Sequence, residues 1–169
     1  MPVLSRKPPD PLTMIRSQDP TLYEWSLSLR LNRLTQMLDR QMGQLLAETV
    51  GIGYGEWRLL AALSRIGRAP FGAIVEITLI DKALASRGLA ALEEKGLVRK
   101  APTAGDARSV TIELTVRGRR VVEHVAPLWK ARQEHLLLGL TKSERVTVYQ
   151  AIDKLARRLE TFAPVSASN

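Results

Sequence analysis

Apolar residues recur every three or four positions from residue 21 onward, a spacing that predicts one long amphipathic helix. The repeating positions are Leu27, Leu31, Leu34, Leu38, Met42 and Leu45. Further apolar residues, among them Trp25 and Leu46, widen this surface beyond a single stripe. The helix is therefore expected to pack against more than one neighbour, which is either the rest of the same chain or a second subunit.

A glycine-rich loop at residues 51–55 interrupts this pattern, and shorter helices follow it. The first two are expected over residues 56–66 and 71–78, with Gly67 as the stop between them. Pro70 suits the first turn of the second of these helices, because an amide hydrogen has no intrahelical partner there.

The next helix has two different faces and clear signals at both ends. Asp81 can cap its N-terminus, and Gly96 suits the position after its C-terminus. Its apolar side is expected to be buried and consists of Ala85, Gly88, Leu89 and Leu92. The opposite side carries small, polar and basic residues, which are Lys82, Ala83, Leu84, Ser86, Arg87 and Ala90. Two short helices joined by three or four residues, the second with such an outer face, are typical of a helix-turn-helix.

A hairpin is expected directly after this helix. Residues 98–101 and 110–114 alternate well enough to form two short strands. The segment between them, Pro-Thr-Ala-Gly-Asp-Ala-Arg, has the proline, glycine and aspartate of an exposed turn. The helix and the hairpin together form a unit with a β-wing.

Two more helices are expected after the wing. Thr115 can cap a helix over residues 116–138, which Pro127 should kink. Thr141 and Glu144 form a capping box that begins the last helix. Its apolar positions are Val146, Tyr149, Ile152, Leu155 or Ala156, Leu159 and Phe162. The long helices carry more apolar surface than a small helix-turn-helix core can cover, so a homodimer is the simplest arrangement.

The composition adds an electrostatic argument. The chain has 169 residues, of which 45% are hydrophobic and 25% charged, as is usual for a globular protein with a buried core. Its formal net charge is +8, and residues 65–120 hold 11 Lys and Arg against 6 Asp and Glu. A basic helix and loop suit an anionic polymer, and nucleic acid is the usual one. The alternative is that these charges only keep the protein in solution.

Several functional classes are excluded or disfavoured. The chain has no cysteine, which excludes disulfides, thiolate metal sites and thiol-based redox sensing. Its two histidines, His124 and His135, are 11 residues apart in sequence, or about 16 Å along a helix, too far to share a metal ion. The sequence has no phosphate-binding glycine loop, no metal-ligand spacing and no motif of a catalytic triad. We therefore expect neither an enzyme nor a cofactor.

The two ends of the chain are expected to be flexible. Residues 1–20 contain five prolines and no periodic pattern, which predicts an extended arm, and residues 163–169 are expected to form a tail. The N-terminus lacks the apolar core of a signal peptide, and no apolar run approaches the length of about 18 residues that a membrane span requires. We therefore expect a cytoplasmic protein without a membrane partner.

Three stretches of the sequence together form a signature. They are Gly55-Glu56-Trp57-Arg58-Leu59-Leu60, the segment from Asp81 to the Leu-Glu-Glu-Lys-Gly-Leu-Val run, and Gly105-Asp106-Ala107-Arg108 with the later Leu114-Thr115. With the order of the helices, they resemble the MarR family of bacterial winged helix-turn-helix regulators over about residues 22–162. Gly53 and Gly55 depart from the family, which often has a capping Thr or Ser and a larger residue there. This departure leaves the start of the helix near residue 56 open.

The resemblance implies a fold that is mainly α with a small β-wing. A winged helix-turn-helix core over residues 52–115 would be joined to long N- and C-terminal dimerisation helices, over residues 21–51 and 116–162. Each subunit of a homodimer would insert its recognition helix into the major groove of double-stranded DNA. The operator would be a pseudo-palindrome whose half-sites lie about one helical turn, ~10 bp, apart.

The resemblance also implies which residues of the recognition helix contact DNA. Arg87 occupies the family's DNA-contacting position and can pair bidentately with a guanine or clamp a phosphate. The alternative is a surface arginine that pairs with Glu93 or Glu94. The other implied contacts are hydrogen-bond donors on Lys82 and Ser86, and apolar groups for a thymine methyl on Ala83 or Leu84.

On the wing, Arg108 matches the family arginine that enters the adjacent minor groove. Asp106 is expected to hold Arg108 or the wing backbone in place rather than to contact DNA. Lys100 is a candidate phosphate contact. Arg99, Arg117, Arg119 and Arg120 are further candidates, and each of them can equally be a solvated surface charge.

Family members often respond to small aromatic or anionic effectors that bind between the dimer helices and the DNA-binding lobe. In this chain the helices that would line such a pocket carry Trp25, Arg30, Arg33, Arg58, His124 and Trp129. We therefore expect a dimeric transcriptional regulator, a repressor that is released by an aromatic, anionic or acyl-CoA type of effector. The alternative is a winged-helix module that binds protein or RNA without effector control.

Overall fold

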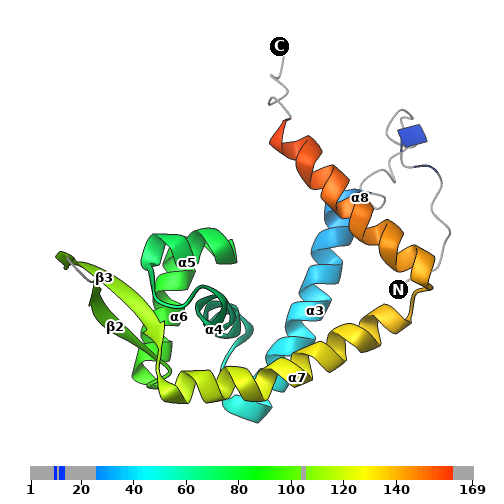
Figure 1. Cartoon of the computed structure of the whole chain (residues 1–169). Helices are drawn as coiled ribbons and strands as arrows, with labels where there is room; N and C mark the ends of the chain where they lie inside the picture. Colours follow the sequence, from blue (N-terminus) through cyan, green and yellow to red (C-terminus); the bar gives the residue numbers. More distant parts are fainter. Residues whose placement is uncertain (1–9, 11, 14–25, 104–105, 162–169) are drawn as a thin grey trace. The chain divides into compact units, whose positions relative to one another are not determined.

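The computed structural model describes residues 10, 12–13, 26–103 and 106–161. Its helices and strands are α3 (Leu27–Val50), α4 (Tyr54–Ile66), β1 (Ala69–Pro70), α5 (Phe71–Thr78), α6 (Lys82–Glu94), β2 (Val98–Thr103), β3 (Asp106–Leu114), α7 (Val116–Leu138) and α8 (Lys142–Glu160) (Figure 1). The chain divides into two compact units, which meet between Glu123 and His124. The fold is mainly helical with a small antiparallel wing, as the sequence predicted.

The helix-turn-helix lies in the first unit and consists of α5 and α6. Three residues join the two helices, and the predicted range of α5 agrees with the observed one. Leu79, the first residue of the turn, has a left-handed backbone with a φ of 53° and is 86% exposed. The length of the turn, three residues, agrees with the three or four that the sequence predicted.

The inner faces of α4, α5 and α6 form the core of this unit. Its fully buried side chains include Leu59, Leu60 and Leu63 of α4, Ile74 of α5 and Leu92 of α6. The predicted inner face of α6 is confirmed for Ala85, Leu89 and Leu92, which are all buried. Gly88 is partly exposed, and a Cβ at this position would lie 2.8 Å from Cδ1 of Leu59. The glycine lets α6 approach α4 closely.

Both predicted ends of α6 are confirmed. Oδ1 of Asp81 accepts hydrogen bonds from the amides of Ala83 at 2.9 Å and Leu84 at 3.1 Å, which caps the N-terminus. Gly96 has a φ of 67°, and its amide donates to the carbonyl of Glu93 at 2.9 Å. A residue with a Cβ adopts this left-handed conformation only with strain, so glycine suits the end of the helix.

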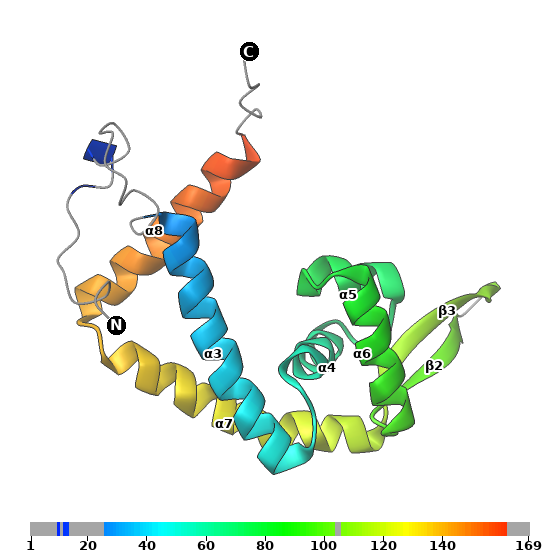
Figure 2. The same cartoon turned by 180° about the vertical axis from the view of Figure 1, so that it is seen from behind.

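The sheet has the strand order β1-β3-β2 and is antiparallel. Val98 lies opposite Leu114, and the β2–β3 pairing continues to Thr103 and Asp106, beyond the predicted strands. The backbone hydrogen bonds of the hairpin extend it past the last residues whose alternation is visible in the sequence. The sequence did not predict β1, because two residues are too few to show a period. Figures 1 and 2 show that the β2–β3 hairpin projects beyond α6.

α4 begins at Tyr54, two residues before the expected start near residue 56, which Gly53 and Gly55 had left open. The cause is the side chain of Glu56, whose Oε2 accepts a hydrogen bond from the amide of Gly53 at 2.6 Å. An acid at the third helical position satisfies the amide that precedes the helix, and no Ser or Thr cap is required. The predicted start of α3 at residue 21 lies outside the described residues, and the observed helix runs from Leu27 to Val50.

The predicted range of α7 is confirmed, and the hydroxyl of Thr115 accepts a hydrogen bond from the amide of Gly118 at 3.0 Å. Pro127 stands inside this helix, and the kink there stays a prediction. The predicted capping box of α8 is confirmed, since Oε2 of Glu144 accepts the amide of Thr141 at 2.8 Å. This backbone hydrogen bond, followed by the bond from the Thr141 hydroxyl, lowers the pKa of Glu144.

α8 has no buried side chain in the structure. Its apolar positions Val146, Tyr149, Ile152, Leu155 and Leu159 are between 40% and 73% exposed, and Phe162 lies outside the described residues. No helix in the described part of the chain is long and apolar enough to cross a membrane. Among the same residues, no group of three or more His, Cys, Asp or Glu could hold a metal ion.

Candidate nucleic-acid interface

The outer face of α6 is open to solvent along its length. All six residues that the sequence placed there are exposed, namely Lys82, Ala83, Leu84, Ser86, Arg87 and Ala90, and we call this set the reading face. Within the described part of the chain, Arg87 forms no hydrogen bond or ion pair. Among the described residues, the alternative ion pair of Arg87 with Glu93 or Glu94 is not formed, and Glu93 binds Lys100. The helix therefore presents an unpaired guanidinium between two capped ends.

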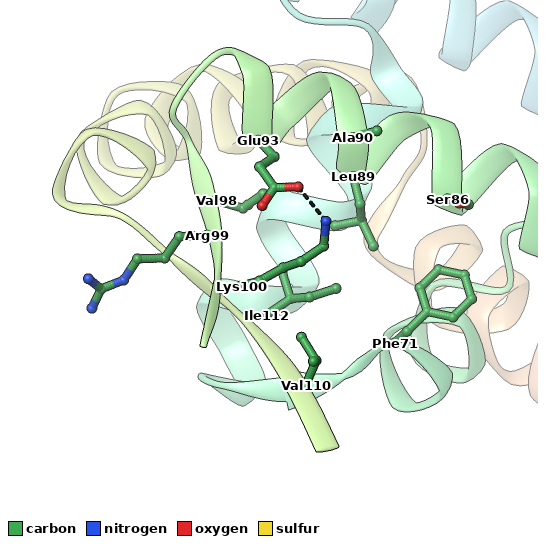
Figure 3. Close-up of a pocket in the computed structure, with 10 residues that line it drawn as sticks. All are labelled: Phe71, Ser86, Leu89, Ala90, Glu93, Val98, Arg99, Lys100, Val110 and Ile112. Carbon is green, nitrogen blue, oxygen red and sulfur yellow. Dashed lines mark hydrogen bonds and ion pairs between the residues drawn. The ribbon is translucent and has the colours of Figure 1, made fainter. Parts of the chain in front are cut away.

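Lys100 on β2 forms an ion pair with Glu93 on α6. Its Nζ lies 2.6 Å from Oε2 of Glu93, and the two side chains are 63% and 39% exposed (Figure 3). Lys100 stays a predicted phosphate contact, but its ammonium must be shared with Glu93 or released by it. Asp106 and Arg108 belong to β3, and their side chains lie outside the description, so their predicted roles also stay predictions.

A carboxylate at the base of the wing binds two arginines. Oε2 of Glu113 accepts Nε of Arg68 at 2.8 Å, and Oε1 accepts Nε of Arg99 at 2.7 Å. The hydrogen bond from Arg68, followed by the one from Arg99, lowers the pKa of Glu113. We did not predict this cluster from the sequence. Arg99 and Glu113 become neighbours only in the observed register of β2 and β3.

Two of the candidate phosphate contacts at the start of α7 bind backbone carbonyls, and their contacts with phosphate stay predictions. Nη1 of Arg117 donates to the carbonyl of Lys95 at 3.0 Å, and Nη1 of Arg119 donates to that of Leu114 at 2.9 Å. Both arginines hold the end of the winged unit against the first turn of α7. Arg120 is exposed, and a phosphate contact there stays a prediction.

Two cavities border α6. The larger, of about 300 Å³, lies between α6 and the wing, and Figure 3 shows Phe71, Leu89 and Ile112 around it, with the Glu93–Lys100 pair across one side. The smaller, of about 260 Å³, lies between α6 and the start of α4. Ser86 lines the larger cavity and Leu84 the smaller, so both cavities reach the reading face.

The predicted effector residues line neither of these cavities. Trp25 lies outside the described residues, Arg30 and Arg33 are partly buried on α3, and His124 and Trp129 are exposed in the second unit. Nη2 of Arg58 donates to the carbonyl of Thr78, the last residue of α5. An effector site made from these six residues therefore stays a prediction.

Tyr54 is a polar residue beside Arg58 that we did not predict from the sequence. Burial raises the pKa of its phenol, the charge of Asp39 on α3 raises it further, and Arg58 opposes the shift. The charges of Asp39 and Arg58 therefore act in opposite directions on a partly buried phenol at the start of α4. Tyr54 lies in the glycine-rich stretch at residues 51–55, which was expected to be a loop. The sequence therefore did not indicate that its side chain is partly buried.

The sequence matches known proteins across most of the winged unit and the helices beside it. The model of the MarR family matches residues 50–109. A relative from Bacillus subtilis, the uncharacterized HTH-type transcriptional regulator YwaE, is 27% identical over 136 residues, which are 80% of this chain and 80% of that protein.

Solved structures share this fold over most of the chain. A MarR/EmrR family transcriptional regulator from Acinetobacter has a TM-score of 0.73 at 26% identity, over 80% of this chain and 95% of its own. A mutant of Escherichia coli MarR, complexed with operator DNA, has a TM-score of 0.72 at 21% identity, over 82% and 99%. Bordetella bronchiseptica BpsR, whose DNA binding is described as regulated by 6-hydroxynicotinic acid, has a TM-score of 0.62 at 22% identity, over 75% and 98%.

Proposed function

We propose that this chain, as a member of the MarR family of winged helix-turn-helix transcriptional regulators, a family without enzymatic activity, is a homodimeric repressor whose operator binding is relieved by a small molecule. The observation that carries this proposal is the reading face of α6. It is exposed, it includes Arg87, which has no ion pair among the described residues, and the helix beneath it is capped at one end by Asp81 and packed on the core.

The chemistry of the reading face suits the major groove. A guanidinium that pairs bidentately with O6 and N7 of guanine contributes about 1–3 kcal/mol of discrimination against the wrong base. Ser86 and Lys82 add hydrogen-bond donors, while Ala83 or Leu84 can meet a thymine methyl. Arg108 would enter the minor groove beside the wing, and Lys100 would contact a phosphate. In this proposal residues 52–115 form the DNA-binding lobe.

The exposed apolar positions of α8 support a dimer. Six large apolar side chains of α8 are at least 40% exposed, namely Val146, Val148, Tyr149, Ile152, Leu155 and Leu159. Another protein surface is the usual cover for such a stripe. In the proposal, residues 21–51 and 116–162 form the dimer. Two copies of the reading face would then meet half-sites of a pseudo-palindrome about 34 Å apart.

Control by an effector is supported by the regulation described for the structurally similar BpsR. In this chain, Arg58 donates to the carbonyl of Thr78 at the helix-turn-helix, and its charge also acts on the partly buried phenol of Tyr54. An anionic effector that recruits the Arg58 guanidinium would withdraw it from the end of α5. Aromatic acids, phenols and acyl-CoA thioesters are the classes to test.

The test begins with selection of operator sequences from random duplexes by the wild-type protein, followed by footprinting. Arg87→Ala should weaken binding to the selected operator about 10- to 100-fold and relax the preference at one base position in each half-site. Lys100→Ala, the control for a phosphate contact, should weaken all duplexes alike and reduce the salt dependence. Titration of the three effector classes into the wild-type complex should release the DNA with one of them. The absence of a protected palindrome at moderate salt would refute the proposal.

A further inference from the structure

The ends of four helices meet at Lys95, the residue that follows α6. Its Nζ donates to the carbonyl of Gly51, the C-cap of α3, at 3.1 Å. The same Nζ lies 2.8 Å from Oε1 and 2.9 Å from Oε2 of Glu56, in the first turn of α4. One ammonium therefore holds the C-terminal end of α6 to the end of α3 and to the beginning of α4.

The first turn of α7 rests on the backbone next to Lys95. Nη1 of Arg117 donates to the carbonyl of Lys95 at 3.0 Å, and the hydroxyl of Thr115 donates to that of Gly96 at 2.7 Å. A Cβ on Gly118 would lie only 2.0 Å from the carbonyl oxygen of Leu97, so the two backbones are in direct contact. We call this set of contacts around Lys95 the Lys95 junction.

The ion pair of the junction is better placed than an ordinary surface pair. The side chain of Glu56 is 14% exposed and that of Lys95 is 38% exposed. The Glu56 carboxylate also accepts the amide of Gly53 at 2.6 Å, so its position is fixed by the cap of α4. Charge-assisted hydrogen bonds between preoriented, partly buried groups are stronger than those between free side chains.

A small tilt of α6 at Lys95 would displace the opposite end of the helix. Residue 83, near the other end of α6, lies about 18 Å away along the helix axis, so a tilt of about 5° at the junction would displace it by about 1.6 Å. Such a displacement exceeds the range of about 0.5 Å over which an N–H···O hydrogen bond to a base keeps its strength. The orientation of α6 at Lys95 therefore decides whether the reading face fits a base pair.

We propose that Lys95 and Glu56 are positioning residues for DNA recognition. Their ion pair sets the orientation of α6 against the ends of α3 and α7, and it transmits a displacement of these helix ends to the reading face. Neither residue needs to contact DNA. The inference rests on the proposed operator binding and adds to it the contact through which the long helices act on base recognition.

The test compares operator DNA, selected by the wild type, with a random duplex of the same length and at the same salt concentration. Glu56→Gln keeps an oxygen for the Gly53 amide but removes the charge that holds Lys95. This variant gains one unit of positive charge, so a purely electrostatic effect would tighten binding to both duplexes. Positioning predicts the opposite sign for the operator, a loss of about tenfold, with binding to the random duplex unchanged or tighter.

Lys95→Met should likewise weaken operator binding about tenfold or more, and the double variant should be no weaker than the weaker single variant, because both changes break one contact. Lys130→Met is the matched control, since it removes an exposed cation whose partner, Glu134, lies 3.9 Å away on α7. It should change both affinities little and equally. Circular dichroism and the unfolding temperature check that each variant is folded. If Lys95→Met does not fold, the operator affinity of Glu56→Gln alone tests the positioning role.

Operator binding by Glu56→Gln that equals or exceeds that of the wild type would overturn the inference, as would additive effects in the double variant. An equal loss for operator and random duplex would overturn it too. If the wild type itself does not prefer any sequence, the proposed function fails and the inference fails with it. The two failures are thus distinguished by the wild-type measurement alone.

Discussion

Acidic side chains neutralise the cations around the reading face unequally. Glu93 binds Lys100, and Glu113 binds both Arg68 and Arg99. Arg87, by contrast, has no ion pair within the residues that the structure describes. The Arg87 guanidinium can therefore reach a base without first breaking an ion pair, whereas a phosphate contact by Lys100 competes with Glu93.

Glu113 gives a prediction about pH at the scale of a single residue. Because Arg68 and Arg99 lower its pKa in the folded state, the ionised carboxylate stabilises the fold above about pH 4.3, its ordinary value. This contribution is lost as the pH falls through the lowered folded value. Glu113→Gln should therefore unfold at a lower temperature than the wild type at pH 7, by no more than a few degrees, and the difference should shrink steadily below pH 4.

Thermal unfolding at constant ionic strength from pH 7 to pH 2.5 measures this difference. Glu134→Gln is the control, since the Glu134 carboxylate is exposed and its cation lies 3.9 Å away. The control should show almost no change at any pH. A difference for Glu113→Gln that stays constant from pH 7 to pH 2.5 would argue against the assigned cause.

At the scale of the elements, local periodicity was sufficient for the helices that carry the reading face. The bounds of α5 and α7 and both caps of α6 follow from apolar spacing and from single capping residues such as Asp81 and Gly96. The start of α4 could not be placed from the sequence. The Glu56 carboxylate, inside the helix, caps it by accepting the amide of Gly53, and Gly53 and Gly55 are not usual residues for a helix start. Capping chemistry inside a glycine-rich stretch leaves no apolar period to detect.

The side-chain pairs of the candidate site were largely beyond prediction from the sequence. Arg68 and Glu113 are 45 residues apart in the chain, and Lys95 and Glu56 are 39 apart. Such pairs depend on tertiary packing and on the register of the hairpin. Apolar periodicity within one helix carries no information about either. The outward position of Arg87 was predictable, because it follows from the pattern of a single helix.

The contact between α7 and Leu97, the residue before β2, gives a prediction at the scale of elements. A methyl group on Gly118 would overlap the backbone oxygen of Leu97, which cannot rotate away as a side chain could. Gly118→Ala should therefore lower the free energy of unfolding by about 3 kcal/mol or more, although alanine favours a helix. Urea unfolding at a fixed protein concentration measures it.

Gly43→Ala on α3 is the matched control, because the added Cβ would have its nearest neighbour, Cβ of Tyr54, at an ordinary 3.9 Å. It should raise the free energy of unfolding by about 0.5–1 kcal/mol. Equal effects of the two substitutions would mean that the backbones of Gly118 and Leu97 are not held at the observed separation.

At the scale of the molecule, the apolar stripe of α8 has no cover within the described part of the chain. α8 buries none of its side chains in the single chain, while its charged and apolar residues are sorted onto different faces. A monomer would expose this stripe permanently. In the proposed dimer the stripe is covered, and the spacing of two reading faces is set by helices that do not themselves read DNA.

Ile152→Glu tests the dimer. Ile152 is 50% exposed in the centre of the stripe, and a carboxylate there would have to be buried without a partner in the proposed interface. The variant should be a monomer at micromolar concentration by sedimentation velocity, and its operator affinity should fall at least about 100-fold through the loss of the second half-site.

Gln150→Glu introduces the same charge about 200° around the helix and should leave the dimer intact. A dimer that persists in Ile152→Glu and still protects a palindrome would place the interface elsewhere.

No linker separates the wing from the long helix that follows it. The hydroxyl of Thr115 donates to the carbonyl of Gly96 and accepts the amide of Gly118, so β3 continues directly into α7 through one shared residue. For protein engineering, this rules out a simple cut at residue 115 when DNA specificity is grafted from one relative to another. A transplanted lobe must include residues 115–118 and the backbone carbonyls after α6 that they contact. Without these contacts, the orientation of the recognition helix relative to the start of α7 would change, and so would its position on DNA.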